Sequence, residues 1–149
     1  MLDKIFNNEF TFVPYESVGN LSFNESEKSI KSKLRDIEQE YDNYDDSGKT
    51  IIFKDLDNVS LYFDINNNFY GIHFFKSIRF SLNGKVYDIN FEEFTEKDLI
   101  KISDDFKITS TEEGTDYTSE KLGIDFYFND NNYLEAVLFM SKEYCKNEI

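Results

Sequence analysis

The sequence is poor in the residues that most catalytic and metal-binding sites require. Its 149 residues include one cysteine, one histidine, one proline and no tryptophan, and glycine occurs only 6 times. One cysteine cannot form an internal disulfide, and one histidine cannot supply a zinc site built from several imidazoles. The few glycines form no glycine-rich phosphate loop. These absences predict a protein that is not an enzyme and carries no cofactor.

Basic residues are scarce relative to acidic ones. The chain has 16 Lys and Arg against 30 Asp and Glu, which gives a net charge of −14. Such a charge repels the phosphates of nucleic acids and of anionic lipids, and it accelerates encounter with a basic partner. Acidity also keeps an aromatic-rich chain soluble without any partner. The composition argues against nucleic-acid and membrane binding, and it leaves a basic protein partner as one of two interpretations.

Long apolar runs are absent as well. No segment approaches the roughly 20 apolar residues of a membrane-spanning helix. The start, MLDKIFNNEF, lacks the basic residues and the long apolar stretch of a secretory signal peptide. The lone Cys145 gives no reason to invoke an oxidising compartment. We therefore expect a cytoplasmic protein.

Aromatic residues are abundant, with 16 Phe and 10 Tyr, and large rings favour strands. The segment Val59–Phe75 has apolar residues at alternate positions before an Asn-rich turn, and a similar segment lies at Gly123–Phe139. Period-two alternation is typical of strands with one buried face, and Asn tolerates the left-handed backbone of tight turns. Each segment is predicted to form a β-hairpin.

Helices and further strands are expected around these hairpins. Asn24 can cap a helix whose apolar stripe would run from Ile30 to Tyr41 through Leu34 and Ile37. A capping-box pattern at 95–98 predicts a short helix over about 96–103. Other strands are predicted at 10–13, 18–23, 50–54, 77–82, 85–89, 106–109 and 115–119, with Asn83-Gly84 as a hairpin turn and 141–149 as a short helix or tail.

These elements predict an α+β fold in a single domain over residues 1–149, a length that one core can support. The sheet would be mainly antiparallel and covered on one face by two helices. Because helix, strand and hairpin recur in the same order, residues 21–82 and 89–140 are interpreted as a possible tandem duplication. The alternative is that such elements recur by chance in an α+β domain.

Metal and catalytic sites find little support. Asn43, Asp45, Ser47 and Gly48 resemble the start of a calcium loop, but Lys54 stands where the bidentate glutamate is required. No calcium site is predicted. The single histidine, at position 73, is interpreted as a residue of a half-exposed strand, and the cysteine has no nearby base to activate it.

The outward faces of the two hairpins carry the functional hypothesis. In the second hairpin the even-numbered residues of 134–140 are expected in the core, and the odd-numbered ones outside; in the first hairpin the even-numbered residues of 70–74 are expected in the core. An acidic, tyrosine-bearing face would result, open to a partner unless a second layer buries it. The predicted partner-binding residues are Tyr62, Asp64, Asp125, Tyr127, Tyr133 and Glu135, with Asp42, Asp45 and Asp46 steering a partner from a loop.

A short, acidic, single-domain chain with the start FVPYESVGNLSF and an apparently repeated helix-and-hairpin unit resembles bacterial immunity proteins, which accompany polymorphic and contact-dependent growth-inhibition toxins. The repeated layout is also similar to that of the β-lactamase inhibitor protein family, which occupies an enzyme with a concave sheet bearing aromatics and acids. The resemblance implies that the protein binds a cognate toxin domain, such as a basic nuclease, and blocks its active site or an adjacent surface.

Two other functions remain open from the sequence. The same sheet face could form a pocket around His73 in a small-ligand-binding module or a minor enzyme. Alternatively, a mobile element could encode the chain as a DNA mimic that blocks a host nucleic-acid enzyme.

Overall fold

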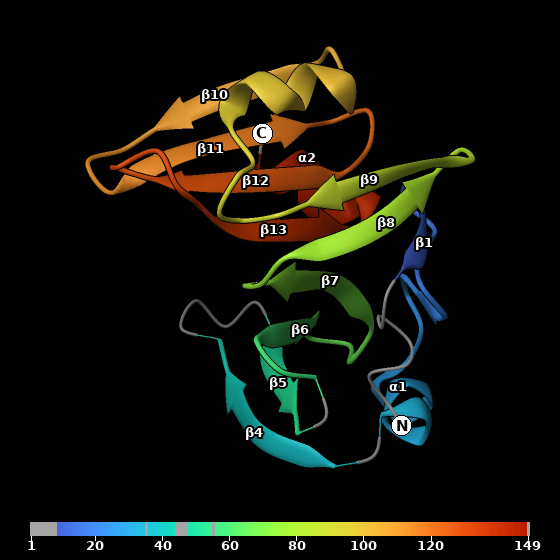
Figure 1. The fold of residues 1–149 in the computed structure, drawn as a ribbon. Helices are drawn as coiled ribbons and strands as arrows, with labels where there is room; N and C mark the ends of the chain where they lie inside the picture. The colour runs from blue at the N-terminus through green and yellow to red at the C-terminus, as the bar shows by residue number, and fades with distance from the viewer. Residues whose placement is uncertain (1–8, 35, 44–47, 55, 149) are drawn as a thin grey trace.

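The computed structural model describes residues 9–34, 36–43, 48–54 and 56–148. Within these ranges the chain forms two β-sheets and three short helices (Figure 1). The helices are α1 (Glu27–Lys33), the 3₁₀ helix η2 (Glu96–Lys101) and α2 (Lys142–Glu148). The strands are β1 (Phe10–Val13), β2 (Ser17–Val18), β3 (Leu21–Ser22), β4 (Ile37–Asp42), β5 (Lys49–Phe53), β6 (Val59–Phe63), β7 (Phe69–Phe74), β8 (Ile78–Leu82), β9 (Lys85–Ile89), β10 (Phe106–Ser110), β11 (Gly114–Ser119), β12 (Ile124–Asn129) and β13 (Leu134–Met140).

The larger sheet has eight described strands in the order β10-β11-β12-β13-β7-β6-β5-β4, and every neighbouring pair is antiparallel. In Figure 1 strands β10–β13 occupy the upper half of the molecule and β4–β7 the lower half. The two halves join where β13 pairs with β7. The fold is therefore α+β with a mainly antiparallel sheet, as predicted.

A second sheet, of five described strands in the order β3-β2-β1-β8-β9, packs against one face of the larger sheet. Its one parallel pair joins β1 to β8, strands far apart in sequence. Aromatic rings fill the space between the sheets: Phe12 and Phe80 both contact the ring of Phe139, with centroid distances of 4.7 and 5.4 Å. We call this covered side of the larger sheet its inner face. The prediction that two helices alone cover the sheet is not confirmed, because a second sheet provides much of the cover.

Helix α1 is shorter than the predicted helix. Its N-cap is Ser26, whose hydroxyl oxygen accepts a hydrogen bond from the backbone N–H of Ser29 at 3.1 Å, whereas Asn24 has a positive φ of 73°. The helix ends at Lys33 with Leu34 as its C-cap, and the last two residues of the predicted stripe, Ile37 and Tyr41, lie in β4. Intrinsic helix preference is a weak force, and the backbone ladder between β4 and β5 outweighs it here.

Three local predictions are confirmed. Asn83 and Gly84 have φ values of 52° and 82°, the two left-handed residues of a type I′ turn, and they join β8 to β9. At the start of η2 the backbone N–H of Thr95 donates to Asp98 Oδ2 at 2.8 Å, as a capping box requires. This hydrogen bond holds the pKa of the Asp98 carboxyl below its usual value. Leu99 is buried beneath η2.

The two predicted hairpins, β6–β7 and β12–β13, correspond at positions 65 residues apart. Their turns contain Asn67 and Asn132, with φ values of 63° and 65°. In each turn the residue three positions earlier, Asp64 or Asn129, accepts two hydrogen bonds at its side-chain Oδ1 from the backbone N–H groups two and four residues later. The same side-chain-to-backbone geometry therefore closes both turns.

Each hairpin also contains a β-bulge at the same place. The ladder skips Tyr70 in the first hairpin and Glu135 in the second, again 65 positions apart. One extra residue reverses the alternation of side chains beyond it. The predicted faces are therefore wrong on one side of each bulge: Phe69, Val137 and Phe139 belong to the main core. The predicted core positions Ile72 and Phe74 of β7 are confirmed.

The strand order of the larger sheet reads as two matching halves. Strands β10-β11-β12-β13 and β4-β5-β6-β7 meet at the central pair, where Leu138 lies opposite His73, its counterpart 65 residues earlier. Matching turns, bulges and strand order are what a duplicated gene segment would produce. An internal duplication stays our prediction, and these correspondences favour it with the sheet halves as its units.

Candidate functional site

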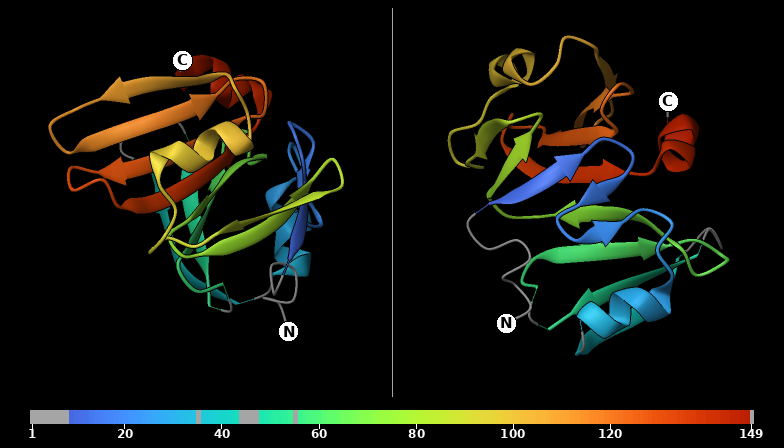
Figure 2. Two further views of the ribbon diagram at one scale, coloured as in Figure 1. Left: turned by 45° about the horizontal axis from the view of Figure 1, so that its top comes forward. Right: turned by 90° about the vertical axis from the view of Figure 1, so that its right-hand side faces the viewer.

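The outer face of the larger sheet, opposite the five-stranded sheet, carries the candidate site. Helix α2 lies on this side, and the right-hand view of Figure 2 places it across the sheet from η2. Leu138, Met140 and Cys145 form a small buried cluster there, packed against Tyr62 and Tyr144. Helix α2 therefore covers the middle of the outer face, and the part formed by β10–β13 remains beside it.

A hollow of about 350 Å³ opens between α2 and the strands β10–β13, and we call it the outer-face hollow. Its floor is apolar and its walls carry aromatic rings, two carboxylates and two threonines. Its described lining contains no Lys or Arg. The lining residues are His73, Phe75, Thr109, Asp116, Thr118, Asp125, Tyr127, Ala136, Leu138, Met140 and Tyr144.

The two carboxylates come from neighbouring strands. Asp116 on β11 lies opposite Tyr127 on β12 in the ladder, and Thr118 lies opposite Asp125. The Thr118 hydroxyl donates to Asp125 Oδ1 at 2.5 Å, which fixes that carboxylate against the sheet. All four side chains line the hollow. Because alternate residues of a strand share a face, the register alone brings them together.

Tyr127 lies in a negative electrostatic environment. Its hydroxyl donates to the backbone carbonyl of Glu113 at 3.0 Å. Desolvation, followed by the negative charges of Glu135 and Glu113, raises the pKa of the Tyr127 phenol. The hydroxyl therefore stays protonated at neutral pH, and its hydrogen bond connects the ring to the turn between β10 and β11. A cation approaching this region meets an attractive potential.

His73 lies in the wall of the outer-face hollow, at the β13–β7 pair where the two halves of the sheet join. Its Nδ1 lies 2.8 Å from the Tyr62 hydroxyl, and its ring lies 4.5 Å from that of Phe75 by centroid distance. Burial lowers the pKa of the His73 imidazole to about 4, so the ring is neutral at pH 7. It can therefore offer a hydrogen bond but no charge to a bound group. The prediction of a half-exposed strand is wrong, because five of the six residues of β7 are buried and His73 is the one that is partly exposed.

Three of the predicted partner-binding residues do not line the outer-face hollow. Tyr62 is half-buried, with its ring stacked 6.0 Å from Tyr70 and packed beside α2. Asp64 uses its carboxylate to accept the turn hydrogen bonds. Tyr133 is 62% exposed at the β12–β13 turn, and because β7 and β13 are antiparallel, that turn and the one containing Asp64 lie at opposite ends of the sheet. The predicted single binding face is wrong in this respect: it divides into two regions.

The remaining predicted residues lie nearer the edges. Glu135 is exposed at the bulge of β13, close enough to affect the Tyr127 phenol. Asp42 is exposed at the end of β4. Asp45 and Asp46 lie outside the described residues, as does part of the calcium-loop pattern. The side chain of Asn43, which begins that pattern, instead accepts a hydrogen bond from Thr50 Oγ1 at 2.6 Å.

Sequence reasoning missed Asp116, Thr118 and Tyr144. The first two were placed on a predicted strand, but their face becomes clear only when β11 is registered against β12. The signal that could have found them is the alternation Asp116, Thr118 paired across the sheet with Tyr127 and Asp125. Tyr144 reaches the hollow from α2, and nothing in the sequence pattern indicates where a short terminal helix docks.

Among the described residues, no cluster of three His, Cys, Asp or Glu side chains is arranged to hold a metal ion. None of the described helices has both the length and the apolar character to cross a bilayer.

Comparisons with known proteins give a likeness of fold only. No protein-family model matches the chain, and no curated protein sequence matches it. The crystal structure of a DUF4309 family protein (YjgB) from Bacillus subtilis subsp. subtilis str. 168 is similar, with a TM-score of 0.58 and 11% identity over 84% of each chain. At such low identity the similarity describes the shared arrangement of strands and helices, and it carries no activity to this chain.

Proposed function

We propose that the chain is an immunity or inhibitor protein that binds and neutralises a cognate bacterial toxin domain with a basic surface. The observation that carries this proposal is the outer-face hollow, whose described lining holds two carboxylates and no basic residue. The net charge of −14 adds a long-range field of the same sign. The binding residues are accordingly centred on Asp116, Asp125 and Tyr127, with Glu135 and Tyr133 at the adjoining turn.

The hollow suits a Lys or Arg side chain of such a partner. Its apolar floor, which includes Ala136 and Leu138, would pack against the aliphatic stem, and the two carboxylates would pair with the charged head. No hydrogen bond or ion pair to another described side chain engages the Asp116 carboxylate. That carboxylate can therefore accept a partner's hydrogen bonds without breaking an internal one. Tyrosine is enriched at protein interfaces and arginine is a frequent anchor residue there, so a tyrosine-bearing hollow that accepts a partner's Arg is consistent with an interface.

A second candidate function rests on the size of the hollow. A volume of about 350 Å³ lies at the lower end of small-molecule pockets, and His73 stands in its wall. A small organic cation, such as a polyamine, would satisfy the same charges. Thermal unfolding with and without millimolar spermidine separates this candidate: a clear rise in melting temperature, combined with no protein partner, would favour the small ligand.

The proposal predicts a toxin gene next to the gene for this chain, and its test is capture of the toxin domain which that neighbour encodes. Purified protein, immobilised at physiological salt, is expected to bind that domain with nanomolar affinity, and coexpression is expected to restore growth to cells producing the toxin. Failure to capture or protect against that toxin would refute the proposal.

Charge variants locate the interface once binding is measured. Asp116→Lys places a cation where the partner's cation should sit, so we expect affinity to fall by about 100-fold or more, corresponding to several kcal/mol. Asp125→Asn keeps an acceptor for Thr118 and removes one charge, so its effect should be smaller. Asp104→Lys, at an exposed loop position outside the hollow, is the matched control. Equal losses in Asp116→Lys and Asp104→Lys would mean that only net charge matters.

A further inference from the structure

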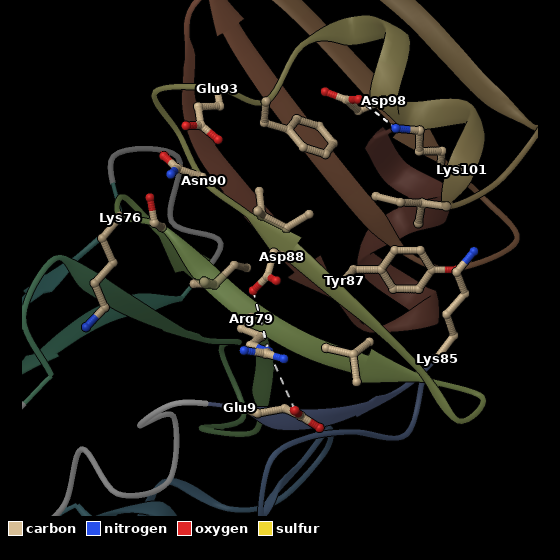
Figure 3. A pocket seen from close by; sticks show the side chains of 16 residues that line it. Glu9, Lys76, Arg79, Lys85, Tyr87, Asp88, Asn90, Glu93, Asp98 and Lys101 are labelled. Atoms are coloured by element: carbon tan, nitrogen blue, oxygen red, sulfur yellow. Dashed lines mark hydrogen bonds and ion pairs between the residues drawn. The ribbon is translucent and has the colours of Figure 1, made fainter.

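A larger cavity, of about 1290 Å³, runs beside β9 between the β8–β9 hairpin and η2 (Figure 3), and we call it the edge groove. β9 is the last described strand of the five-stranded sheet, with β8 on one side only. Val86 and Asp88 point to one face of β9, and Lys85, Tyr87 and Ile89 point to the other, yet all five line the groove. A cavity can contact side chains from both faces of a strand when it runs along the edge of that strand. The edge groove therefore follows the free edge of β9.

The backbone of β9 offers hydrogen-bonding groups along this edge. In a hairpin with a two-residue turn, the residues flanking the turn exchange both ladder hydrogen bonds, and every second pair thereafter does the same. Leu82 and Lys85 flank the turn, so Val86 and Asp88 lie at the alternate positions. Their N–H and C=O groups are therefore directed away from β8. No described segment pairs with them there.

The two sides of the groove differ in chemistry. Toward η2, the side chains of Phe94, Ile102 and Tyr87 give an apolar wall, as Figure 3 shows for the labelled Tyr87 beneath the helix. On the other side, the guanidinium Nε of Arg79 lies 3.5 Å from Asp88 and 3.7 Å from Glu9, forming a charged wall. An extended chain placed in the groove would meet apolar and charged surroundings at alternate residues.

We propose that the edge of β9 binds an extended segment of a partner protein, which adds to the five-stranded sheet as a further strand. The main-chain groups of Val86 and Asp88 would supply the hydrogen bonds, and the apolar wall would select apolar side chains at alternate positions of the segment. The surface lies apart from the outer-face hollow and shares no lining residue with it. The proposal therefore does not depend on the proposed function.

A foreign segment fits this edge better than a second copy of the chain. Two copies would each bring a net charge of −14, and the mutual repulsion opposes self-association. A neutral or basic segment meets no such repulsion. The groove also contains four of the chain's basic residues among its lining, Lys76, Arg79, Lys85 and Lys101, balanced by four acidic ones. Recognition here would rest on the backbone and on apolar contacts more than on net charge.

The experiment uses a synthetic probe of the required chemistry, acetyl-Lys-Val-Thr-Val-Lys-Val-amide, titrated into the full chain by calorimetry. Two control peptides carry N-methyl groups, one on the three Val residues and the other on the remaining three. All three peptides have the same charge and side chains. Since a strand directs alternate N–H groups to opposite edges, one of the methylated peptides must lose its pairing with β9, whichever direction it runs.

Two protein variants complete the design. Val86→Pro removes an N–H that faces the groove and places no ring in the β8 ladder, so an edge strand tolerates it. Ile108→Pro is the matched control, because Ile108 is 64% exposed and occupies the corresponding outward position on the edge strand β10. Circular dichroism and the urea midpoint report whether each variant folds, and the peptide comparison with the unmodified protein stands even if one does not.

The expected result is binding of the unmethylated peptide, at least a tenfold loss for one methylated peptide, and at least a tenfold loss for Val86→Pro with Ile108→Pro unchanged. The Val86 and Asp88 amides should also exchange more slowly with deuterium when the peptide is bound. Equal binding of all three peptides would overturn the proposal, since only charge would then matter. It would likewise be overturned by no binding at 1 mM peptide, or by a dimer in sedimentation experiments that Val86→Pro abolishes.

Discussion

The hydroxyl of Tyr62 and the Nδ1 atom of His73 are 2.8 Å apart, across the ladder between β6 and β7. The bond lies at the boundary between the part of the outer face that α2 covers and the hollow beside it. Burial raises the pKa of the Tyr62 phenol and lowers the pKa of the His73 imidazole to about 4, so both groups are uncharged in the folded protein at neutral pH. We therefore expect acid to change the charge of this pair by protonating His73.

Protonation of His73 is expected to destabilise the fold. The unfolded histidine titrates near its ordinary pKa of about 6.5 and the folded one near 4, so the unfolded state takes up the proton first as the pH falls. The stability that neutral His73 contributes is complete above pH 6.5 and is lost as the pH falls toward 4. Urea unfolding at pH 7 and pH 5, for the unmodified protein and His73→Gln, measures this.

The unmodified protein should lose more stability between these pH values than His73→Gln does, because the carboxylates contribute to both proteins alike. An equal loss would show that the imidazole is not desolvated in the folded state. The variant Tyr62→Phe is a useful companion, since it removes the hydrogen bond and keeps the ring packed against Tyr70.

Local sequence patterns predicted the hairpins well, and long-range pairing decided what they missed. The Asn-Gly turn and the Thr95 capping box are set by a few adjacent residues, and both form as expected. The helix predicted as far as Tyr41 failed because strand β5 was available to pair with residues 37–42. The five-stranded sheet was missed because its parallel β1–β8 pair joins segments about 70 residues apart.

The candidate site was predicted only in part, for a related reason. Asp125 and Tyr127 were placed on the correct face, because β12 alternates without interruption. In β13 the bulge at Glu135 reversed the predicted faces of residues 137–140, and in β7 the bulge at Tyr70 placed Phe69 in the core, while Ile72 and Phe74 lie there as predicted. A bulge has no simple signature in one strand's sequence. Comparing the hairpins with an offset of 65 residues would have aligned these two positions and shown that they follow equivalent turns.

Substitutions at Asn67 and Asn132 should have matching effects, because the two residues occupy equivalent left-handed positions. Asn67→Ala and Asn132→Ala are each expected to lower the free energy of unfolding by about 1 to 2 kcal/mol, because a Cβ without a short polar group is strained at positive φ. The corresponding Gly variants should be neutral or slightly stabilising. Asn131→Ala, in the same turn without a positive φ, is the control. A large difference between the two Ala variants would contradict the equivalence of the turns.

Gly114 supports the position of Tyr127 at the outer-face hollow. A Cβ at this position would lie 2.3 Å from the Phe128 carbonyl oxygen and 2.7 Å from the Tyr127 hydroxyl oxygen. Gly114→Ala is therefore expected to displace the end of β11 and to cost about 1 to 3 kcal/mol in urea unfolding. It should also perturb the Tyr127 ring signals in NMR spectra. A Gly114→Ala variant as stable as the unmodified protein, with unchanged ring signals, would contradict this geometry.

The thiol of Cys145 reports whether α2 stays docked on the outer face. Cys145 is 1% exposed and packs in the cluster of Leu138 and Met140, so a thiol reagent can reach it only when α2 detaches. In the variant Ser110→Cys, the added thiol stands at an exposed position of β10 and serves as an internal control.

Labelling of this variant with a chromogenic disulfide at pH 8 should show one fast and one slow reaction of equal amplitude. Low urea should accelerate the slow reaction alone, because α2 is a single short helix that can open before the sheet does. Two fast reactions in native buffer would mean that α2 is not held against the sheet, and that the wall of the hollow formed by Tyr144 is absent in solution.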